Sequence, residues 1–152
     1  MGYHVPWELI IGGALVSKQF DYCAAAFLRE HTEDYMIILG SDMTFKPTDI
    51  EKLVQAAEER PLSVVDSTSV RANLRVCCNT YGGELKITGE PVEVISTGLG
   101  VSAVSRKLLL HMIDVLHLPE ITTYESTRSY NVWPFFQPVS YTHLTLPTTP
   151  YV

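Results

Sequence analysis

The apolar run Tyr35–Leu39 (YMIIL) is the feature that most constrains how this chain can fold. The run ends abruptly at Gly40, and the polar residues Ser41 and Asp42 follow. A short continuous apolar run bounded by a turn signal is typical of a strand that is covered on both faces. We therefore expect a buried strand at Tyr35–Leu39, with other elements packed on either side of it.

Helical periodicity surrounds this strand. Residues 17–34 place apolar side chains at i, i+4, i+7 and i+8 spacing, with Ser17 as a candidate N-cap. Residues 46–61 carry an apolar stripe with Pro47 in the first turn, and residues 106–117 carry a third such stripe. The sequence thus predicts three amphipathic helices.

A second apolar run, Leu62–Asp66, follows the helix at residues 46–61. A strand, a helix and a strand in succession favour a parallel pair joined by a right-handed crossover. Between Asn73 and Val94, β-rich stretches are separated by glycine-containing turns, which predicts antiparallel strands. The expected fold class is therefore an α/β domain with an antiparallel annex.

Composition and charge limit the ligands that the chain can bind. With 46% hydrophobic and 18% charged residues, the chain has the composition of a soluble globular protein. The net charge of -6 and the lack of clustered Lys and Arg argue against nucleic-acid binding, because phosphate contacts need clustered basic side chains. No apolar run approaches the roughly 18 to 20 residues of a membrane span. The spacing of the cysteines indicates free thiols in a reducing, cytoplasmic compartment.

Asp42 is the candidate functional residue that this pattern singles out. In open α/β sheets, ligands bind at the carboxyl ends of the parallel strands, and Asp42 lies just beyond such an end. A carboxylate there has three ordinary uses: it can coordinate a divalent metal, cap a turn, or accept a proton. The local pattern alone leaves these three uses open.

Several segments, in order, resemble GT-A glycosyltransferases of the family 2 type. Residues 34–54 (DYMIILGSDMTFKPTDIEKLV) resemble the family's central segment, where a buried strand runs into Asp-x-Asp-Met, an aromatic residue, a proline and an Asp-rich helix start. Residues 94–112 (VISTGLGVSAVSRKLLLHM) resemble its later Gly-x-Gly segment with an Arg and a helix. Residues 131–136 (NVWPFF) resemble the aromatic stretch that precedes the family's Glu-Asp segment. The resemblance covers about residues 14–137.

The resemblance implies a GT-A fold, with a mostly parallel, Rossmann-like sheet, and transfer of a sugar from a nucleotide-diphosphate donor to an acceptor. Asp42 matches the second Asp of the motif, which binds Mg²⁺ or Mn²⁺ against the donor diphosphate. Gly40 stands where the family has its first Asp, and Asp21 lies in a segment (Gln19-Phe20-Asp21) that replaces the usual Ala-Arg-Asn. Both departures weaken the expected contacts to the donor.

Other residues are candidates for the same site. Ser41 adjoins Asp42, and Arg71 follows the second predicted strand, where its guanidinium could fork onto a phosphate or simply be solvated. Gly98 and Gly100 match the family's Gly-x-Gly, where the backbone passes close to the acceptor. The alternative for both glycines is a bulge or turn between strands.

The two ends of the sequence suggest an internal fragment. Val139–Val152 resembles the in-frame translation of a transposon-type sequencing adaptor, and we expect it to be a non-native tail. The alternative is an ordinary Thr/Pro-rich terminal segment. Residues 1–138 would then be part of a GT-A domain that lacks its first strand and its catalytic base, and we expect this polypeptide to be inactive. The aromatic side chains in residues 131–136 are either the floor of a sugar site or core residues.

Two other functions remain open on the sequence. The first is a non-catalytic α/β binding or structural domain in which Asp42 only caps a turn, and Gly40 is its best support. The second is a nucleotidyltransferase-like enzyme, which would share the metal chemistry. Such enzymes normally have a Gly-rich, basic N-terminal loop, and the first thirteen residues contain no Lys or Arg.

Overall fold

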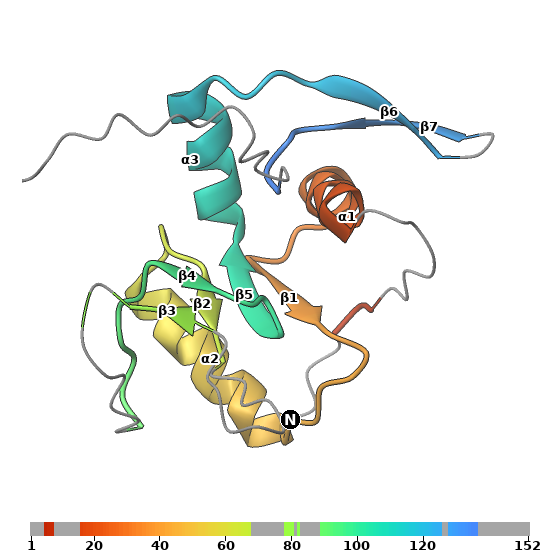
Figure 1. The fold of residues 1–152 in the computed structure, drawn as a ribbon. Helices are drawn as coiled ribbons and strands as arrows, with labels where there is room; N and C mark the ends of the chain where they lie inside the picture. Colours follow the sequence, from red (N-terminus) through yellow and green to blue (C-terminus); the bar gives the residue numbers. More distant parts are fainter. Residues whose placement is uncertain are drawn as a thin grey trace, which may run out of the picture. The chain divides into compact units, whose positions relative to one another are not determined.

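The chain has a mixed α/β structure made of two compact units (Figure 1). The computed structural model describes residues 5–7, 16–67, 78–80, 82, 89–125 and 128–136. One unit, Phe27–His117, is called the sheet unit below. The other, Met1–Ala26 with Leu118–Val152, is called the hairpin unit. Helix α1 (Val16–Glu30) begins in the hairpin unit and ends in the sheet unit.

The sheet unit contains a three-stranded sheet of order β1-β5-β2. Its strands are β1 (Tyr35–Leu39), β2 (Val65–Asp66) and β5 (Val101–Ser105). Both outer strands pair antiparallel with β5. β1 and β2 therefore run in the same direction, but they do not pair with each other as the sequence predicted, because β5 lies between them.

Burial differs from the expectation for β1. Every residue of β5 is buried, whereas in β1 only Ile38 is buried and Leu39 is 48% exposed. The prediction that Tyr35–Leu39 is covered on both faces was therefore wrong. Within the described residues β1 pairs only with β5, so it is an outer strand, and the fully covered position belongs to β5.

Helix α2 (Pro47–Glu59) covers one face of this sheet. Its buried residues Leu53 and Ala57 form a core cluster with Val101 and Ala103 of β5. These residues recur at helical spacing on α2 and at alternate positions on β5, so each element turns one face to the other. The helix predicted over residues 46–61 is thus confirmed, with Pro47 in its first turn.

Local capping fixes where two helices begin. The Asp49 carboxylate accepts the backbone N–H of Lys46 at 2.8 Å, at the start of α2. Helix α3 (Arg106–Leu116) follows β5 directly, and the Ser105 hydroxyl accepts the backbone N–H of Leu108 at 2.9 Å. Each bond satisfies a backbone donor that has no partner inside the helix. The prediction of a helix over residues 106–117 is confirmed.

The antiparallel annex is present in part. β3 (Cys78–Asn79) pairs with β4 (Ser96–Thr97), with Asn79 opposite Ser96. The Asn79 side-chain amide also donates to the Ser96 hydroxyl at 2.7 Å. The predicted stretch at residues 84–88 lies outside the described residues.

The hairpin unit joins the first part of α1 to a strand pair that the sequence did not predict. β6 (Ile121–Glu125) and β7 (Arg128–Val132) pair antiparallel over five residue pairs. The backbone N–H of Phe136 donates to the Asp21 carboxylate at 2.7 Å, and the Phe136 ring meets Phe20 edge to face at 5.4 Å. The segment at residues 131–136 is therefore fastened to α1 by packing and by a buried carboxylate.

Two predicted boundaries shift. α1 begins at Val16, so Ser17 lies inside the helix rather than at its N-cap. β2 is shorter than the predicted Leu62–Asp66, because a turn occupies its first residues and the Ser63 N–H donates to the Arg60 carbonyl. Hydrophobic patterning predicts that a helix or strand is present more accurately than it predicts where that element begins and ends.

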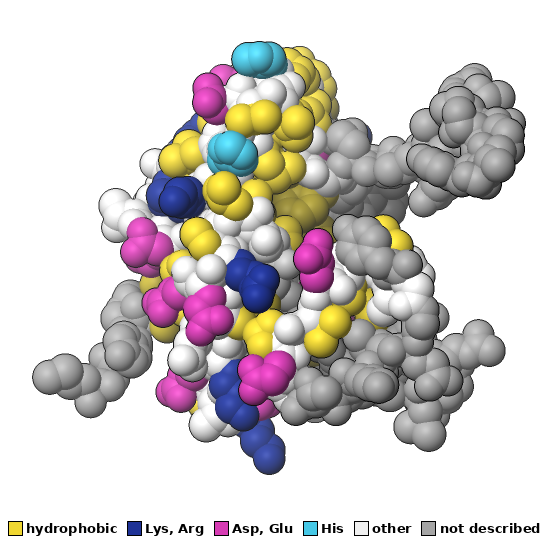
Figure 2. Space-filling model, turned by 90° about the vertical axis from the view of Figure 1, so that its left-hand side faces the viewer, with side chains coloured by type: hydrophobic (Ala, Val, Ile, Leu, Met, Phe, Trp, Pro, Cys, Tyr) yellow, Lys and Arg dark blue, Asp and Glu magenta, His cyan; other side chains and the backbone are white. Residues whose placement is uncertain are grey.

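Helix α3 leaves part of its apolar surface exposed. Leu110, Val115 and Leu116 are each more than half exposed. Figure 2 shows hydrophobic side chains gathered over α3, with acidic and basic side chains interspersed below them over α2.

Among the described residues, no helix is both long enough and apolar enough to cross a membrane.

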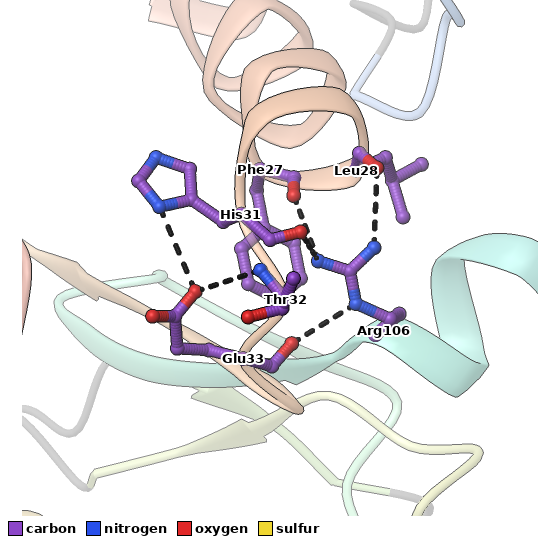
Figure 3. A network of polar contacts seen from close by, with 6 residues as sticks. All are labelled: Phe27, Leu28, His31, Thr32, Glu33 and Arg106. Atoms are coloured by element: carbon purple, nitrogen blue, oxygen red, sulfur yellow. Dashed lines mark hydrogen bonds and ion pairs between the residues drawn. The ribbon is translucent and has the colours of Figure 1, made fainter.

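Arg106 fastens the end of α1 to the start of α3 (Figure 3). Its guanidinium donates to the carbonyls of Phe27 (2.8 Å), Leu28 (3.2 Å), His31 (2.7 Å) and Glu33 (3.0 Å). The guanidinium also lies 4.5 Å from the centre of the Phe27 ring, in cation–π geometry. The last carbonyls of a helix have no partner within it, so one planar side chain satisfies several of them at once.

We expect Arg106→Ala to destabilise the protein by about 3 kcal/mol, because hydrogen bonds from a charged donor are lost and helix carbonyls are left unpaired. Arg106→Lys should recover only part of this, since an ammonium group lacks the planar fork. Urea unfolding followed by circular dichroism measures both. The exposed neighbour Lys107 provides the control, and Lys107→Ala should change stability by less than about 0.5 kcal/mol. Equal stability of Arg106→Lys and the wild type would contradict the role of the fork.

Candidate functional site

Three segments of the sheet unit meet at one end of its sheet. They are the turn after β1, the end of β2, and the loop Gly98–Gly100 that leads into β5. Because β5 runs antiparallel between the two outer strands, its beginning lies beside both of their carboxyl ends. The register places Leu39 opposite Val101 and Asp66 opposite Ser102. Segments that are far apart in the sequence are therefore neighbours here.

The turn after β1 carries Asp42. The Met43 N–H donates to the Gly40 carbonyl at 3.1 Å and closes the turn. The Gly40 N–H donates to the Gly100 carbonyl at 2.8 Å, which ties the turn to the loop before β5. Ser41 and Asp42 lie at the tip of the turn, and both are exposed. The Asp42 carboxylate is thus held near the end of the sheet and remains accessible to a ligand.

The loop before β5 has an unusual backbone. Leu99 has a φ angle of 53°, in the left-handed region. A residue with a side chain adopts this region at a cost of about 1 kcal/mol or more, and such residues are concentrated at functional sites. The neighbouring Gly98 and Gly100 carry no side chain that would crowd this bend, and Gly100 supplies the carbonyl that holds Gly40.

Asp66 is a second carboxylate at the same end of the sheet. It accepts a hydrogen bond from the buried Ser102 hydroxyl at 2.6 Å and another from the Thr97 hydroxyl. The next residue, Ser67, donates its N–H to the Val101 carbonyl at 2.9 Å. Asp66 ends a strand that the sequence predicted, but the sequence did not single it out as a site residue. A carboxylate that ends an apolar run was the available signal.

The structure brings most of the predicted site residues together. Ser41, Asp42, Gly98 and Gly100 all lie in the segments that meet at this end of the sheet. Arg71 lies outside the described residues. The aromatic residues of the segment 131–136 belong to the hairpin unit, where Phe136 contacts Phe20.

A metal ion at this end of the sheet would take only part of its ligands from the described side chains. The described residues hold no group of three or more His, Cys, Asp or Glu side chains that could bind a metal ion by themselves. Mg²⁺ is commonly bound through one or two carboxylates, with phosphate and water completing its ligands. Asp42 is accessible for this purpose, whereas both oxygens of Asp66 already accept hydroxyl groups.

The turn leaves little space for a side chain at Gly40. A Cβ atom there would lie 3.0 Å from Met43 Cγ, 3.1 Å from Asp42 Oδ1 and 3.2 Å from the Gly100 carbonyl oxygen. These separations are shorter than ordinary van der Waals contacts. A carboxylate at position 40 would also be placed close to that of Asp42. The glycine found where the family motif has its first Asp is therefore the residue that this turn accommodates.

Comparison of the chain with protein-family models, with curated proteins and with solved structures finds no match.

We expect Gly40→Ala to destabilise the sheet unit by about 1 to 2 kcal/mol, because the added methyl group presses on a backbone carbonyl that the sheet holds in place. The 2.8 Å bond from Gly40 to Gly100 should lengthen as the turn moves away. Urea unfolding measures the loss, and the exposed Ser41→Ala serves as the control with little effect. Equal stability of Gly40→Ala and the wild type would show that the turn accommodates a side chain at position 40, and it would contradict this prediction.

Proposed function

We propose that residues 1–138 are part of a metal-assisted glycosyltransferase of the GT-A, family 2 type. The donor is a nucleotide-diphosphate sugar bound at the end of the sheet, and the acceptor lies on the side of Gly98–Gly100. The mostly parallel GT-A sheet of the whole enzyme and a cytoplasmic location belong to the same proposal.

The observation that carries this proposal is the bond between the two glycine-containing motifs. The turn with Asp42 and the loop Gly98–Gly100 match two motifs of the same resemblance, and they are far apart in the sequence. Here the Gly40 N–H and the Gly100 carbonyl join them at 2.8 Å, beyond the carboxyl end of β1. Binding residues are commonly carried by loops that a rigid scaffold positions, and both of these segments are joined to β5.

The residues of this end have distinct roles in the proposal. Asp42 holds Mn²⁺ or Mg²⁺ through a carboxylate oxygen, which hard cations prefer. When bound, the cation acts as a Lewis acid that offsets negative charge on the departing nucleoside diphosphate. The exposed Ser41 hydroxyl donates to a phosphate oxygen in this proposal, and Arg71 is a further candidate for that contact.

A non-catalytic α/β binding or structural domain is the second candidate. The tight environment of Gly40 favours it, because a side chain at this position would press on Asp42, Met43 and the Gly100 carbonyl. In that case Asp42 is only a turn residue, and the two functions differ in whether a nucleotide binds with a metal.

We expect UDP or GDP to bind only in the presence of Mn²⁺, and Asp42→Ala to weaken this binding at least about tenfold, since a direct metal ligand is removed. Isothermal titration calorimetry with and without Mn²⁺ in excess over the protein measures the effect.

The matched control is Asp114→Ala, which removes an exposed carboxylate from α3, away from the end of the sheet that carries Asp42. It should bind Mn²⁺ and nucleotide as the wild type does. Nucleotide binding that is independent of metal, or unaffected by Asp42→Ala, would favour the non-catalytic domain. No binding of either nucleotide with Mn²⁺ would also count against the glycosyltransferase.

A further inference from the structure

Asp66 closes the base of the loop that carries Gly98–Gly100. Its two hydroxyl partners lie on opposite sides of this loop, Thr97 just before it and Ser102 just after it. One carboxylate at the end of β2 therefore bonds to both the incoming and the outgoing chain. These two hydrogen bonds hold the two ends of the loop next to each other.

The loop needs such a closure because its backbone is strained. Leu99 is in the left-handed region, with φ of 53°. A strained residue persists only where the surrounding structure over-determines its conformation. Here the constraints come from Asp66 on the side chains of Thr97 and Ser102, and from β5 on the outgoing backbone.

The loop in turn positions the segment that carries Asp42. The Gly100 carbonyl, one residue after Leu99, accepts the Gly40 N–H. If the loop relaxes, this carbonyl moves, and the turn from Gly40 to Met43 loses its attachment to β5. A path of direct bonds thus runs from Asp66 through the loop to the turn, although Asp66 is the last residue of β2 and Asp42 follows β1.

We propose that Asp66 is a positioning residue that holds the Gly98–Gly100 loop and, through the Gly100 carbonyl, the Asp42 turn. The importance of this role for metal and nucleotide binding rests on the proposed function. In this proposal Asp66 acts through its bonds to the Thr97 and Ser102 hydroxyl groups, and Asp42 is the metal ligand. The Asp66 carboxylate reduces the reorganisation needed when a ligand reaches Asp42.

The test uses Asp66→Ala and Thr97→Val, with Thr97→Ser as the conservative variant that keeps the hydroxyl. Amide hydrogen exchange is followed by NMR in the metal-free protein at Gly40 and at Met36, which pairs with Val104 in the same ladder. We expect exchange at Gly40 to accelerate about tenfold or more in the first two variants while Met36 is unchanged, because local opening is separable from global unfolding. Thr97→Ser should behave as the wild type.

Binding of Mn²⁺ with UDP is then measured on the same variants, and affinity should fall about fivefold or more with Asp66→Ala and Thr97→Val, as expected when preorganisation is lost. Ser129→Ala, which removes an exposed hydroxyl on β7, is the control. Equal acceleration at Gly40 and Met36 would show general destabilisation and overturn the positioning role, as would no change at Gly40. If Asp66→Ala does not fold, Thr97→Val alone decides.

The binding and exchange measurements distinguish failure of the proposed function from failure of the positioning role of Asp66. If the wild type binds no Mn²⁺ with UDP but Gly40 exchange still responds selectively to Thr97→Val, the positioning role stands and the proposed function falls. If binding is present and Asp42-dependent while Gly40 exchange does not respond, the proposed function stands and the role of Asp66 falls.

Discussion

The pairing of β5 with both β1 and β2 is the constraint on which the rest of the sheet unit depends. β5 is buried along its whole length and is the strand onto which α2 packs. Its antiparallel direction puts its first residues beside the carboxyl ends of both outer strands. The candidate site exists because of this arrangement, since a parallel strand in the same position would bring its other end there.

The buried polar residues of β5 show how closely the sheet and the site are linked. Ser102 is fully buried, and a buried hydroxyl without a partner would be costly. Asp66 supplies that partner from β2, and Ser105 finds others in the Leu108 amide and the Pro61 carbonyl. Both serines of the strand are therefore satisfied by neighbouring elements.

The sequence predicted the elements whose patterns are local. The apolar run at β1 and the stripes of α2 and α3 were found because periodicity and capping residues lie within a few positions of each other. β5 was not predicted as a strand. Its alternation of Val, Ser and Ala is weak, and its full burial comes from elements distant in the sequence.

The hairpin β6–β7 was missed for a different reason. Its strands contain Thr, Tyr, Ile and Val, so β-propensity was present, but a continuous apolar face was not. At the site, Asp42 could be selected from its place after an apolar run. Asp66 could not be assigned its role, because its partners Thr97 and Ser102 meet it only in the folded chain.

The Arg106 network also has a consequence for the order in which the chain folds. The guanidinium bonds to carbonyls that precede it by up to 79 residues. A contact over such a distance closes a large loop, whose entropic cost must be met before the bond contributes. The carbonyls in the last turn of α1 therefore lack the Arg106 guanidinium until β5 and α3 have formed. We infer that the C-terminal turn of α1 becomes ordered late in folding.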